Sequence, residues 1–548
     1  MNHPYFLILT ITISLLYPNE NITISATVID SNNDPIKDVN IYTDRNGVST
    51  NDKGSFTLTC FSDALITISH ISYSDITLKA KDIPSLIIMK TRNINTNEII
   101  IRGGTAIESF KETNNSLMII QSKDIKESFN HFEDIISLVP NLNFSGGTSR
   151  PRYFQIRGIG ELSQFSGEGP PHFSVGFTID NIDFSGIGMA GLLNDINQIE
   201  VFKGPQSSIY GSNALGGMIN ISSNDPNPYK EGEFSISIGD DKHLGLSGFY
   251  NFPITKKLYS RISFSKNQLD GFRNNLFYNR TDTNKKNELT FRSKLFYTPS
   301  DNLSFKLTYM LVDIKNGYDV WATDNNGFNT YTDYIGKDYQ RVNAISLKII
   351  YRLTDSIKLN SITSFSQNKI IYNYDGDWGN DIYWKNNYDW YAESDSYDFS
   401  DPIFGGEYWD YSFTDETTRK RTNKSQEYRL ITKNTISGLY VSQTNEEDIR
   451  NGFLMGGNVD NLDSYFKLLN ISAYTSYKWN LKKNLSLLTR LRIEKNQINS
   501  KIITTFYGTD SGDFNKEITS FHWGGKLGLK AALNDFSDLA FCISKGYK

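Results

Sequence analysis

The sequence predicts a mainly β protein. Its C-terminal half is expected to form an incomplete transmembrane antiparallel β-barrel, preceded by an α+β domain and a small N-terminal β-sandwich. Aromatic residues make up 13% of the 548 residues, yet the mean hydropathy is only -0.43. This combination suits strands with one apolar face and one wet face. Beyond the N-terminus no apolar run approaches the roughly 18 residues that a membrane helix requires, so a membrane-spanning form would cross with strands.

Charge, cysteine content and motif content argue against several classes of protein. The formal net charge is -5 and no long basic run occurs, so we expect no nucleic-acid partner. Cys60 and Cys542 lie too far apart in the chain to indicate a disulfide framework or a metal cluster. The six histidines are scattered, and no metalloprotease, serine-hydrolase or phosphate-loop pattern is present. We therefore expect no enzyme, no cofactor and no resident metal.

The first two modules are short. Residues 1–20 contain an apolar run of about the length of a secretory h-region, which predicts a signal peptide, with a buried first strand as the alternative. Residues 21–90 break into short, alternating apolar runs separated by turns, which predicts a small β-sandwich. This segment resembles the regulatory-like domain first described in carboxypeptidases. The resemblance implies no catalytic group, and a passive spacer is the simpler interpretation.

Residues 91–110 form a polar linker that contains a β-prone run, namely Glu98, Ile99, Ile100 and Ile101, followed by the glycines at 103 and 104. A strand of this kind can add to the edge of another protein's sheet. The alternative is an ordinary linker strand without a partner.

Residues 111–226 combine strands and many glycines with a predicted helix over 123–138, where apolar residues recur at helical spacing. Four segments follow in order: Gln-Ile-Arg-Gly-Ile-Gly (155–160), Phe-Thr-Ile-Asp-Asn-Ile (177–182), Ile-Glu-Val-Phe-Lys-Gly-Pro-Gln-Ser-Ser-Ile-Tyr-Gly (199–211) and Asn-Ala-Leu-Gly-Gly-Met-Ile-Asn-Ile (213–221). Together they resemble the plug domain of TonB-dependent outer-membrane receptors. A G-x-G-x-x-G pattern within this region matches a dinucleotide fingerprint, but no βαβ unit surrounds it, which favours an apical plug loop.

Residues 227–548 are dominated by long alternating strands. Leucine, phenylalanine and tyrosine alternate with serine, lysine and threonine over 303–311, and 289–297 and 485–493 repeat the pattern. Such alternation is typical of a barrel with a wet lumen. A soluble sandwich can produce it too, and the resemblance of the preceding domain to a plug decides between them. Plugged transporters close with about 22 strands, and roughly fourteen are expected here, so we expect a C-terminally truncated barrel.

The resemblance implies active import of a scarce ligand across the outer membrane, such as a ferric siderophore or a similar iron complex. It also implies a TonB-ExbB-ExbD partner that engages residues 98–101 as a TonB-box-like segment. The barrel would lie in outer-membrane lipid, with the N-terminal domain and the plug on the periplasmic side. Import of an oligosaccharide or of cobalamin, and ligand-sensing signal transduction, are the alternatives. The oligosaccharide importers carry a Lys-Asp-Ala-type segment where this chain has Lys-Gly-Pro-Gln (203–206).

The resemblance further implies a charge network between plug and barrel wall, with Arg157 and Glu200 on the plug against Glu427 on the wall. Buried pairs of this kind fix register at little net gain in stability. Pairing of Arg157 with Glu200 inside the plug is the alternative.

Ligand contacts are expected from the plug loops that face outward and from long extracellular loops. The longest insertion, 375–416, is acidic and rich in aromatic residues. Its carboxylates could hold Ca²⁺ and its rings could stack on a ligand, although a solvated loop would have the same composition. Its charge disfavours an anionic ferric siderophore. The candidate contacts are Phe165, His172, Trp378, Trp384, Trp390 and Trp409.

Overall fold

The computed structural model describes residues 21–548 except 31–33, 71–72, 90–99, 102–107, 110–112, 114, 126–128, 146, 163–170, 388–411, 455–456, 507–508 and 535–536. The chain divides into two compact units, Met1–Ile99 and Ile100–Lys548. None of the helices in the described part is both long enough and apolar enough to cross a membrane. The predicted signal peptide lies outside the described residues.

The first unit contains two small sheets. Its elements are β1 (Asn21–Ile29), β2 (Asn40–Tyr42), β3 (Gly47–Ser49), β4 (Ser55–Phe61), β5 (Leu65–His70), β6 (Tyr73–Lys79), the 3-10 helix η1 (Ala80–Asp82) and β7 (Leu86–Ile88). One sheet has the order β4-β1-β7 and the other β3-β2-β5-β6. Alternate residues of β4 are buried, and they share one apolar cluster with residues of the second sheet such as Ile66 and Ile68. The two sheets therefore enclose a common core.

The second unit begins with a mixed domain, which we call the plug. Its strands are β8 (Ile100–Ile101), β9 (Glu108–Ser109), β10 (Ser116–Gln121), β11 (Leu142–Phe144), β12 (Phe154–Ile156), β13 (Val175–Ile179), β14 (Ile182–Asp183), β15 (Ile196–Lys203) and β16 (Gly217–Ser223). Its helices are η2 (Ser122–Asp124), η3 (Phe132–Leu138), η4 (Gly188–Ala190), α1 (Ser207–Tyr210) and η5 (Ser212–Ala214). A 5-stranded sheet of order β10-β15-β16-β13-β14 forms its centre.

The helix predicted over 123–138 is wrong as a continuous element. Two 3-10 helices, η2 and η3, replace it, because the backbone is extended at Ile125 and again at His131. His131 caps η3: its Nδ1 accepts a hydrogen bond from the backbone N–H of Glu133, while Asp134 accepts one from the N–H of His131. Such a reciprocal cap starts a helix at a defined residue, which helical periodicity alone cannot reveal.

The remaining strands form a 13-stranded sheet. They are β17 (Glu231–Gly239), β18 (His243–Thr255), β19 (Leu258–Leu269), β21 (Lys286–Ser300), β22 (Leu303–Gly317), β24 (Lys337–Thr354), β25 (Ile357–Asp375), β26 (Phe413–Ile431), β27 (Thr435–Leu454), β28 (Gly457–Lys482), β29 (Leu485–Phe506), β30 (Thr509–Asn534) and β31 (Ser537–Lys545). Two short strands, β20 (Asn274–Asn275) and β23 (Asn329–Thr330), and helix α2 (Asp381–Asn387) lie in the connections.

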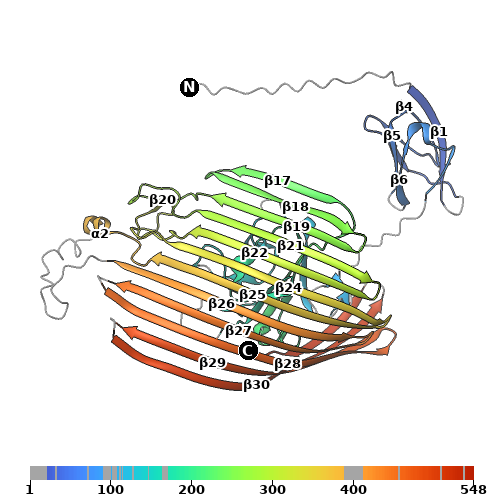
Figure 1. Cartoon of the computed structure of the whole chain (residues 1–548). Helices are drawn as coiled ribbons and strands as arrows, with labels where there is room; N and C mark the ends of the chain where they lie inside the picture. Colours follow the sequence, from blue (N-terminus) through green and yellow to red (C-terminus); the bar gives the residue numbers. More distant parts are fainter. Residues whose placement is uncertain are drawn as a thin grey trace, which may run out of the picture. The chain divides into compact units, whose positions relative to one another are not determined.

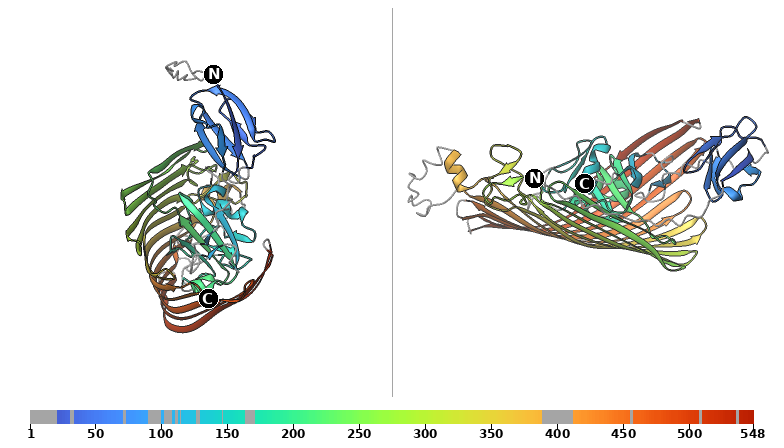
Figure 2. Two further views of the ribbon diagram at one scale, coloured as in Figure 1. Left: turned by 90° about the vertical axis from the view of Figure 1, so that its right-hand side faces the viewer. Right: turned by 90° about the horizontal axis from the view of Figure 1, so that it is seen from above.

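Each strand of this sheet pairs antiparallel with the next one along the chain (Figure 1). The sheet curves around the plug, which lies on its concave side (Figure 2). Among the described strands β17 and β31 are the two edges, so this is an unclosed barrel. The predicted mainly β fold, an incomplete barrel with an α+β plug, is confirmed.

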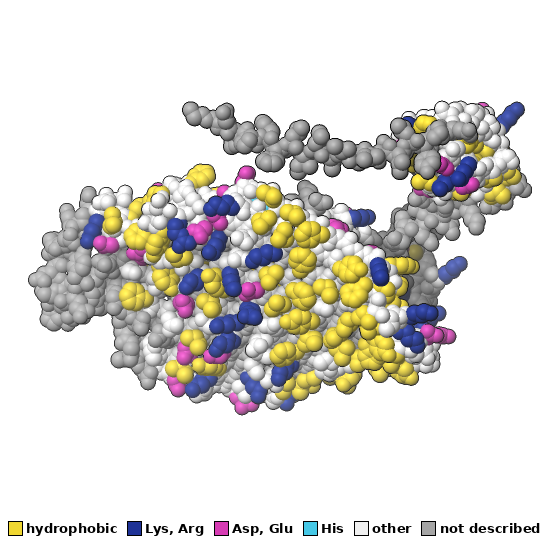
Figure 3. All heavy atoms as spheres, turned by 45° about the horizontal axis from the view of Figure 1, so that its top comes forward, with side chains coloured by type: hydrophobic (Ala, Val, Ile, Leu, Met, Phe, Trp, Pro, Cys, Tyr) yellow, Lys and Arg dark blue, Asp and Glu magenta, His cyan; other side chains and the backbone are white. Residues whose placement is uncertain are grey.

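The two faces of the sheet differ in chemistry. On β21, Thr290, Arg292 and Lys294 are buried toward the plug, while Phe291 and Leu295 lie on the other face. The buried face also contributes apolar residues of β22, β24 and β25 to the core of the plug. Figure 3 shows hydrophobic side chains gathered over part of the outer surface and Lys and Arg over another part. The buried charged residues of β21 therefore face the plug and its apolar residues face outward, as the alternation in the sequence predicts, while other parts of the outer surface also carry Lys and Arg.

The cap of η3 generates a prediction about pH. Burial, aided by Arg150, lowers the pKa of His131 to about 4, below the value near 6.5 of an unfolded chain. The folded plug therefore favours the neutral ring, whose Nε2 donates to the carbonyl of Gly188. This contribution to stability is complete above pH 6.5 and is lost as the pH falls from 6.5 toward 4, by roughly 1.4 kcal/mol per pH unit at most.

Intrinsic amide exchange slows as the pH falls from 6.5 to 4.5, and we expect exchange over 129–139 to slow less than the intrinsic rates predict, because protection is lost over the same range. The variant His131→Asn keeps a capping acceptor that does not titrate, and its protection should change little over the same range. Equal pH dependence in both proteins would contradict the assignment.

Candidate functional site

Buried ion pairs join the plug to the inner face of the sheet. The guanidinium of Arg150 on the plug forms two parallel hydrogen bonds with the carboxylate of Glu288 on β21, at 2.7 and 2.8 Å. Glu133 of the plug also contacts Arg150. The side chains of Arg150 and Glu288 are 4% and 1% exposed. Two-pronged geometry of this kind fixes orientation as well as distance, so it sets the position of this part of the plug.

A second pair follows two residues later in the chain. Nη2 of Arg152 lies 2.5 Å from Asp338 on β24, and the backbone N–H of Ser149 donates to the other oxygen of the same carboxylate at 2.7 Å. The guanidinium of Arg152 also lies over the ring of Tyr372 on β25. Three neighbouring plug residues, Ser149, Arg150 and Arg152, therefore reach three strands of the wall.

Acidic residues of the plug meet cations of the wall elsewhere. Asp195 receives two hydrogen bonds of 2.7 Å from Arg261 on β19. Lys294 on β21 contacts both Asp180 and Asp225, and Lys306 on β22 lies 2.6 Å from Asp225. Both the plug and the wall therefore contribute cations and carboxylates to these ion pairs. Displacement of the plug would leave charges of both signs without partners on each side.

The turn that follows α1 packs directly on the wall. Gly211 has φ of +81°, and a Cβ at this position would lie 2.7 Å from Glu494 Oε2 and 3.0 Å from Arg492 Nη2. Arg492 donates to the carbonyl of Ile209 and to Glu494, its neighbour on β29. Glycine satisfies both the backbone conformation and the close approach here.

A cavity of about 370 Å³ lies between the plug sheet and the wall. Its lining is polar and includes plug carboxylates, wall cations and the Tyr210 phenol. Burial, together with the nearby carboxylate of Glu200, raises the pKa of Tyr210. The charged and phenolic side chains around the cavity are Asp180, Asp183, Tyr210, Asp225, Lys294, Lys306, Lys348, Glu427, Arg429, Tyr440 and Arg492.

The predicted network of Arg157, Glu200 and Glu427 is divided among separate contacts. Arg157 is exposed and donates to the hydroxyl of Ser116 at 2.9 Å. Glu200 is buried and accepts hydrogen bonds from Gln198 and Asn220. Glu427 contacts Arg429 at 2.6 Å and the hydroxyl of Tyr474. The two carboxylates share the surroundings of Tyr210, whereas Arg157 is bonded within the plug.

The TonB-box-like segment is described only in part. Glu98 and Ile99 lie outside the described residues, while Ile100 and Ile101 form strand β8, which pairs antiparallel with β9. Its role as a partner-binding strand stays a prediction.

The candidate ligand contacts fall in different surroundings. Phe165, Trp390 and Trp409 lie outside the described residues. Trp384 is buried and its indole N–H donates to Asp377. Burial lowers the pKa of His172 to about 4, and its buried Nε2 has no hydrogen-bond partner among the described residues.

Trp378 is 40% exposed and stacks on Trp321, which is 47% exposed, with ring centroids 5.7 Å apart. Trp321, which lies in the 318–336 connection, was not among the residues that the sequence predicted to contact a ligand. The stack brings together the two long connections at the same end of the sheet. The sequence does not show that a tryptophan in one connection stacks on a tryptophan in another.

The sequence also did not predict the ion pairs between plug and wall, although it did predict which wall residues face inward. Strand alternation places Glu288, Lys294 and Lys306 on the charged face of their strands. Their partners, however, are 138, 114 and 81 residues away in the chain, and no periodicity links them.

The comparisons with known proteins agree with this architecture. Residues 109–218 match the family model described as TonB-dependent Receptor Plug Domain. The ferric enterobactin receptor PirA of Pseudomonas aeruginosa is 25% identical over 301 residues, which are 50% of this chain and 39% of PirA. The vitamin B12 transporter BtuB of Vibrio vulnificus is 34% identical over 80 residues, 15% of this chain and 13% of BtuB.

The solved structure of the ferric yersiniabactin uptake receptor FyuA from Yersinia pestis has a similar fold. Its TM-score is 0.64 at 16% sequence identity, over 77% of this chain and 63% of FyuA. The chain thus spans less than two thirds of the length of these relatives.

The Arg150–Glu288 pair generates a prediction about stability. We expect Arg150→Met to destabilise the seated plug by roughly 3–5 kcal/mol, because the carboxylates of Glu133 and Glu288 lose their buried partner. Adding Glu288→Leu should recover more than half of this loss, because Glu133 keeps Lys286 at 3.6 Å. Denaturant titration read by proteolysis of the plug measures both changes.

A matched control is Arg280→Met, which removes a half-exposed partner of Asp282 in a loop and should have little effect. If the double variant were as unstable as Arg150→Met alone, the buried pair would not be the cause.

Proposed function

We propose that this chain, an outer-membrane TonB-dependent receptor by its plug and its barrel fold, imports a scarce small-molecule ligand across the outer membrane. The energy would come from a TonB-ExbB-ExbD complex that engages residues 98–101. The observation that carries the proposal is the seating of the plug: ion pairs on four wall strands, buried on β19, β21 and β24 and half-buried on β22, hold a separate, folded domain on the inner face of the sheet.

Ion pairs suit a plug that must be released and seated again. A buried pair contributes little net stability compared with an apolar contact, but it tolerates only one arrangement. Water that enters the interface during release would solvate the separated charges. An external input of energy can therefore displace the plug without unfolding the barrel, and reseating restores the same register.

A ferric siderophore or a similar iron complex is the cargo we favour. The relatives that support it are named as receptors for ferric enterobactin and ferric yersiniabactin. The match to a vitamin B12 transporter supports cobalamin as an alternative, and the acidic character of 375–416 leaves room for a cationic or sugar-like ligand. We propose no catalytic step, since the chain shows none of the common catalytic motifs.

Within this proposal, residues 1–20 are a signal peptide, 21–90 a regulatory-like domain on the periplasmic side, 91–110 the partner-binding linker, 111–226 the plug and 227–548 the barrel. Arg157, Glu200 and Glu427 act in the response of the plug to its partner. Phe165, His172, Trp378, Trp384, Trp390 and Trp409 contribute to ligand binding, with Trp321 added because it stacks on Trp378.

Loss of the linker strand tests the energy source. Replacing residues 97–104 by a Gly/Ser segment of equal length should abolish growth on the transported iron complex, because a strand needed for pairing is lost. Growth of iron-limited cells that depend on this receptor, supplied with candidate ferric complexes, is the measurement. An equal-length Gly/Ser replacement of 91–96 is the control and should transport normally. If the first variant grows on every iron source that the unaltered chain uses, the proposed iron import through this strand is wrong.

The stacked indoles test the ligand site. Trp378→Ala should weaken binding of the transported complex roughly tenfold, because exposed, preorganised rings are strong contributors to binding. Equilibrium titration by fluorescence quenching measures the dissociation constant. Trp479→Ala, which removes an equally exposed ring from the outer face of β28, is the control. Equal affinities of the two variants would exclude the stack from the site.

A further inference from the structure

Trp378, which carries one of the two stacked indoles, has an unusual backbone conformation. Its φ is +61°, in the left-handed region that a residue with a bulky side chain adopts only at a cost in free energy. The other described residues with a positive φ, glycines aside, are Asp, Asn, Arg or Lys, so Trp378 is the only aromatic residue among them. Such a conformation persists only where the surrounding structure holds it.

Asp375, the last residue of β25, accepts hydrogen bonds from both sides of this turn. Its Oδ1 accepts from the backbone N–H groups of Asp377 and Trp378, each at 3.1 Å. Its Oδ2 accepts from the N–H groups of Asp333 and Tyr334, at 3.2 and 3.3 Å. The first two groups belong to the turn of the tryptophan, and the other two belong to the connection that carries the second indole. One carboxylate therefore joins the two backbones from which the stacked rings project.

Asp377 holds the other side of the turn. Its Oδ1 accepts from the backbone N–H of Gly379 at 2.9 Å and from the indole N–H of Trp384 at 3.3 Å. Its Oδ2 accepts from the N–H of Phe413, the first residue of β26, at 2.8 Å. Asp377 thus joins the start of the 376–412 connection to its end. We call Asp377 and Asp375 together the aspartate clasp, because the backbone is held on both sides of the tryptophan.

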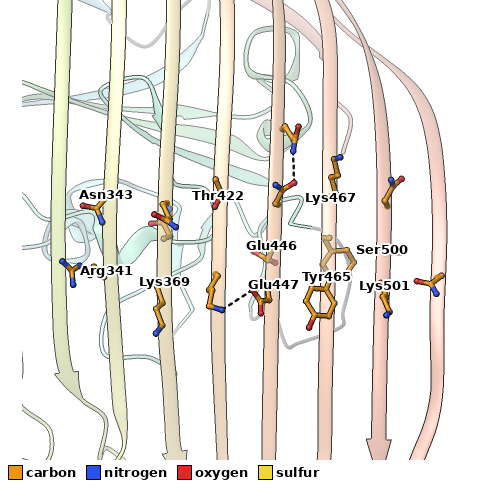
Figure 4. Close-up of a pocket in the computed structure, with 18 residues that line it drawn as sticks. Arg341, Asn343, Lys369, Thr422, Glu446, Glu447, Tyr465, Lys467, Ser500 and Lys501 are labelled. Atoms are coloured by element: carbon orange, nitrogen blue, oxygen red, sulfur yellow. Dashed lines mark hydrogen bonds and ion pairs between the residues drawn. The ribbon is translucent and has the colours of Figure 1, made fainter.

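Hydrogen bonds, and no cation, compensate the burial of the clasp. Asp375 and Asp377 are 4% and 6% exposed, and neither has an ion-pair partner in the part of the chain that the structure describes. The exposed Glu447 on β27, in contrast, contacts Lys420 on β26 at 3.3 Å (Figure 4). A carboxylate is costly to bury unless hydrogen bonds replace its lost water. Seven N–H groups do so here, four on Asp375 and three on Asp377.

Other contacts join the same two connections farther from the tryptophan. The side-chain amide of Asn380 donates to the carbonyl of Tyr331, and the ring centroids of Tyr331 and Tyr383 lie 4.2 Å apart. Neither contact involves the turn at Trp378. Loss of one clasp carboxylate should therefore release the indole without separating the two connections.

The stack that the clasp supports is exposed. The indoles of Trp321 and Trp378 are 47% and 40% exposed, and their planes are inclined by 24°. An exposed side chain that is already held in one orientation loses little conformational entropy when a ligand binds to it. A fixed stack is therefore a better binding surface than two freely rotating rings.

We propose that Asp375 and Asp377 are positioning residues for ligand binding. They hold Trp378 in its left-handed conformation and keep its indole against that of Trp321, so that a ligand meets a stack formed before it arrives. The inference rests on the proposed function for the ligand that would use the stack. The stack itself can be measured without any ligand.

Circular dichroism of the full chain in non-ionic detergent micelles tests the clasp. Two stacked indoles couple their electronic transitions and give a paired positive and negative band, which Trp321→Phe identifies by its loss. Asp375→Asn should lower this band pair at least roughly twofold, because an amide N–H₂ cannot accept the N–H groups that one carboxylate oxygen accepts. Asp377→Asn should lower it as well. The strand signal and the protease resistance of the plug report on the fold in the same samples.

A matched variant controls for the loss of a carboxylate. Asp282→Asn removes a carboxylate that pairs with Arg280 in the 270–285 connection, and it should leave the band pair unchanged. If Asp375→Asn lowers the strand signal too, Asp377→Asn decides, because it keeps the four N–H groups that Asp375 accepts.

Binding of a ferric catecholate complex, whose flat rings can stack on indoles, tests whether the clasp acts through the tryptophan. Asp375→Asn should raise the dissociation constant roughly tenfold, as Trp378→Ala does. The double variant Asp375→Asn/Trp378→Ala should bind no more weakly than Trp378→Ala alone, because the carboxylate acts through the indole. A residue that only stabilised the connections would weaken binding further in the double variant. Fluorescence quenching measures the constants.

Two results would overturn the proposal. They are an unchanged band pair in both asparagine variants, and effects of Asp375→Asn and Trp378→Ala on the dissociation constant that add in the double variant. Failure of the proposed cargo gives a different result. If the band pair depends on Asp375 but the unaltered chain binds no ferric catecholate, the positioning role is supported and an iron complex of this kind is excluded as the ligand.

Discussion

Arg150 on the plug and Glu288 on strand β21 form a buried ion pair on which both partners depend. A sheet whose inner face carries Glu288, Asp338, Arg261, Lys294 and Lys306 cannot enclose those charges without counter-charges. The plug supplies the counter-charges, and it supplies the apolar residues that pack against Val312 and Val342. The wall in turn provides ion-pair partners for the buried cations and carboxylates of the plug. Each domain therefore completes the interior of the other, and neither inner surface would be stable alone in its present form.

The outer face obeys a different constraint, because its surroundings change along the strand. Lipid chains accept only apolar side chains, whereas the headgroup layer accepts charge. The alternation of side chains along each strand lets one backbone meet both demands: odd and even positions face different media, and the outward set changes from isoleucine and leucine to lysine and arginine within one strand. The same backbone pairing thus carries an inner network of buried ion pairs and an outer zone of exposed charges, where Lys420 contacts Glu447.

The inner charges and the exposed side chains of the connections have different roles in the proposed function. Paired charges fix the position of the plug at small net stability, which suits the proposed import, in which the plug leaves its seat and returns to it. Exposed side chains, in contrast, are available to molecules outside the chain. The stacked indoles of Trp321 and Trp378 lie in the long connections, where the proposed ligand would arrive. The position of a side chain in the fold, more than its type, therefore decides whether it holds the plug or is available to a ligand.

The sequence by itself determined the fold class, the inward and outward faces of the long strands and the plug, because strand alternation and turn-forming glycines act over a few residues. It also predicted a TonB-box-like segment, whose role stays a prediction. It overestimated the helix of the plug, where His131 and Asp134 cap a 3-10 helix that periodicity cannot reveal. Only the tertiary structure decided which charges meet. Arg150 finds Glu288 across 138 residues, and Arg157, despite its place in a matched segment, bonds to Ser116. Ion pairing depends on distances in the folded chain. The residues next to a charged side chain in the sequence do not show which distant strand carries its partner.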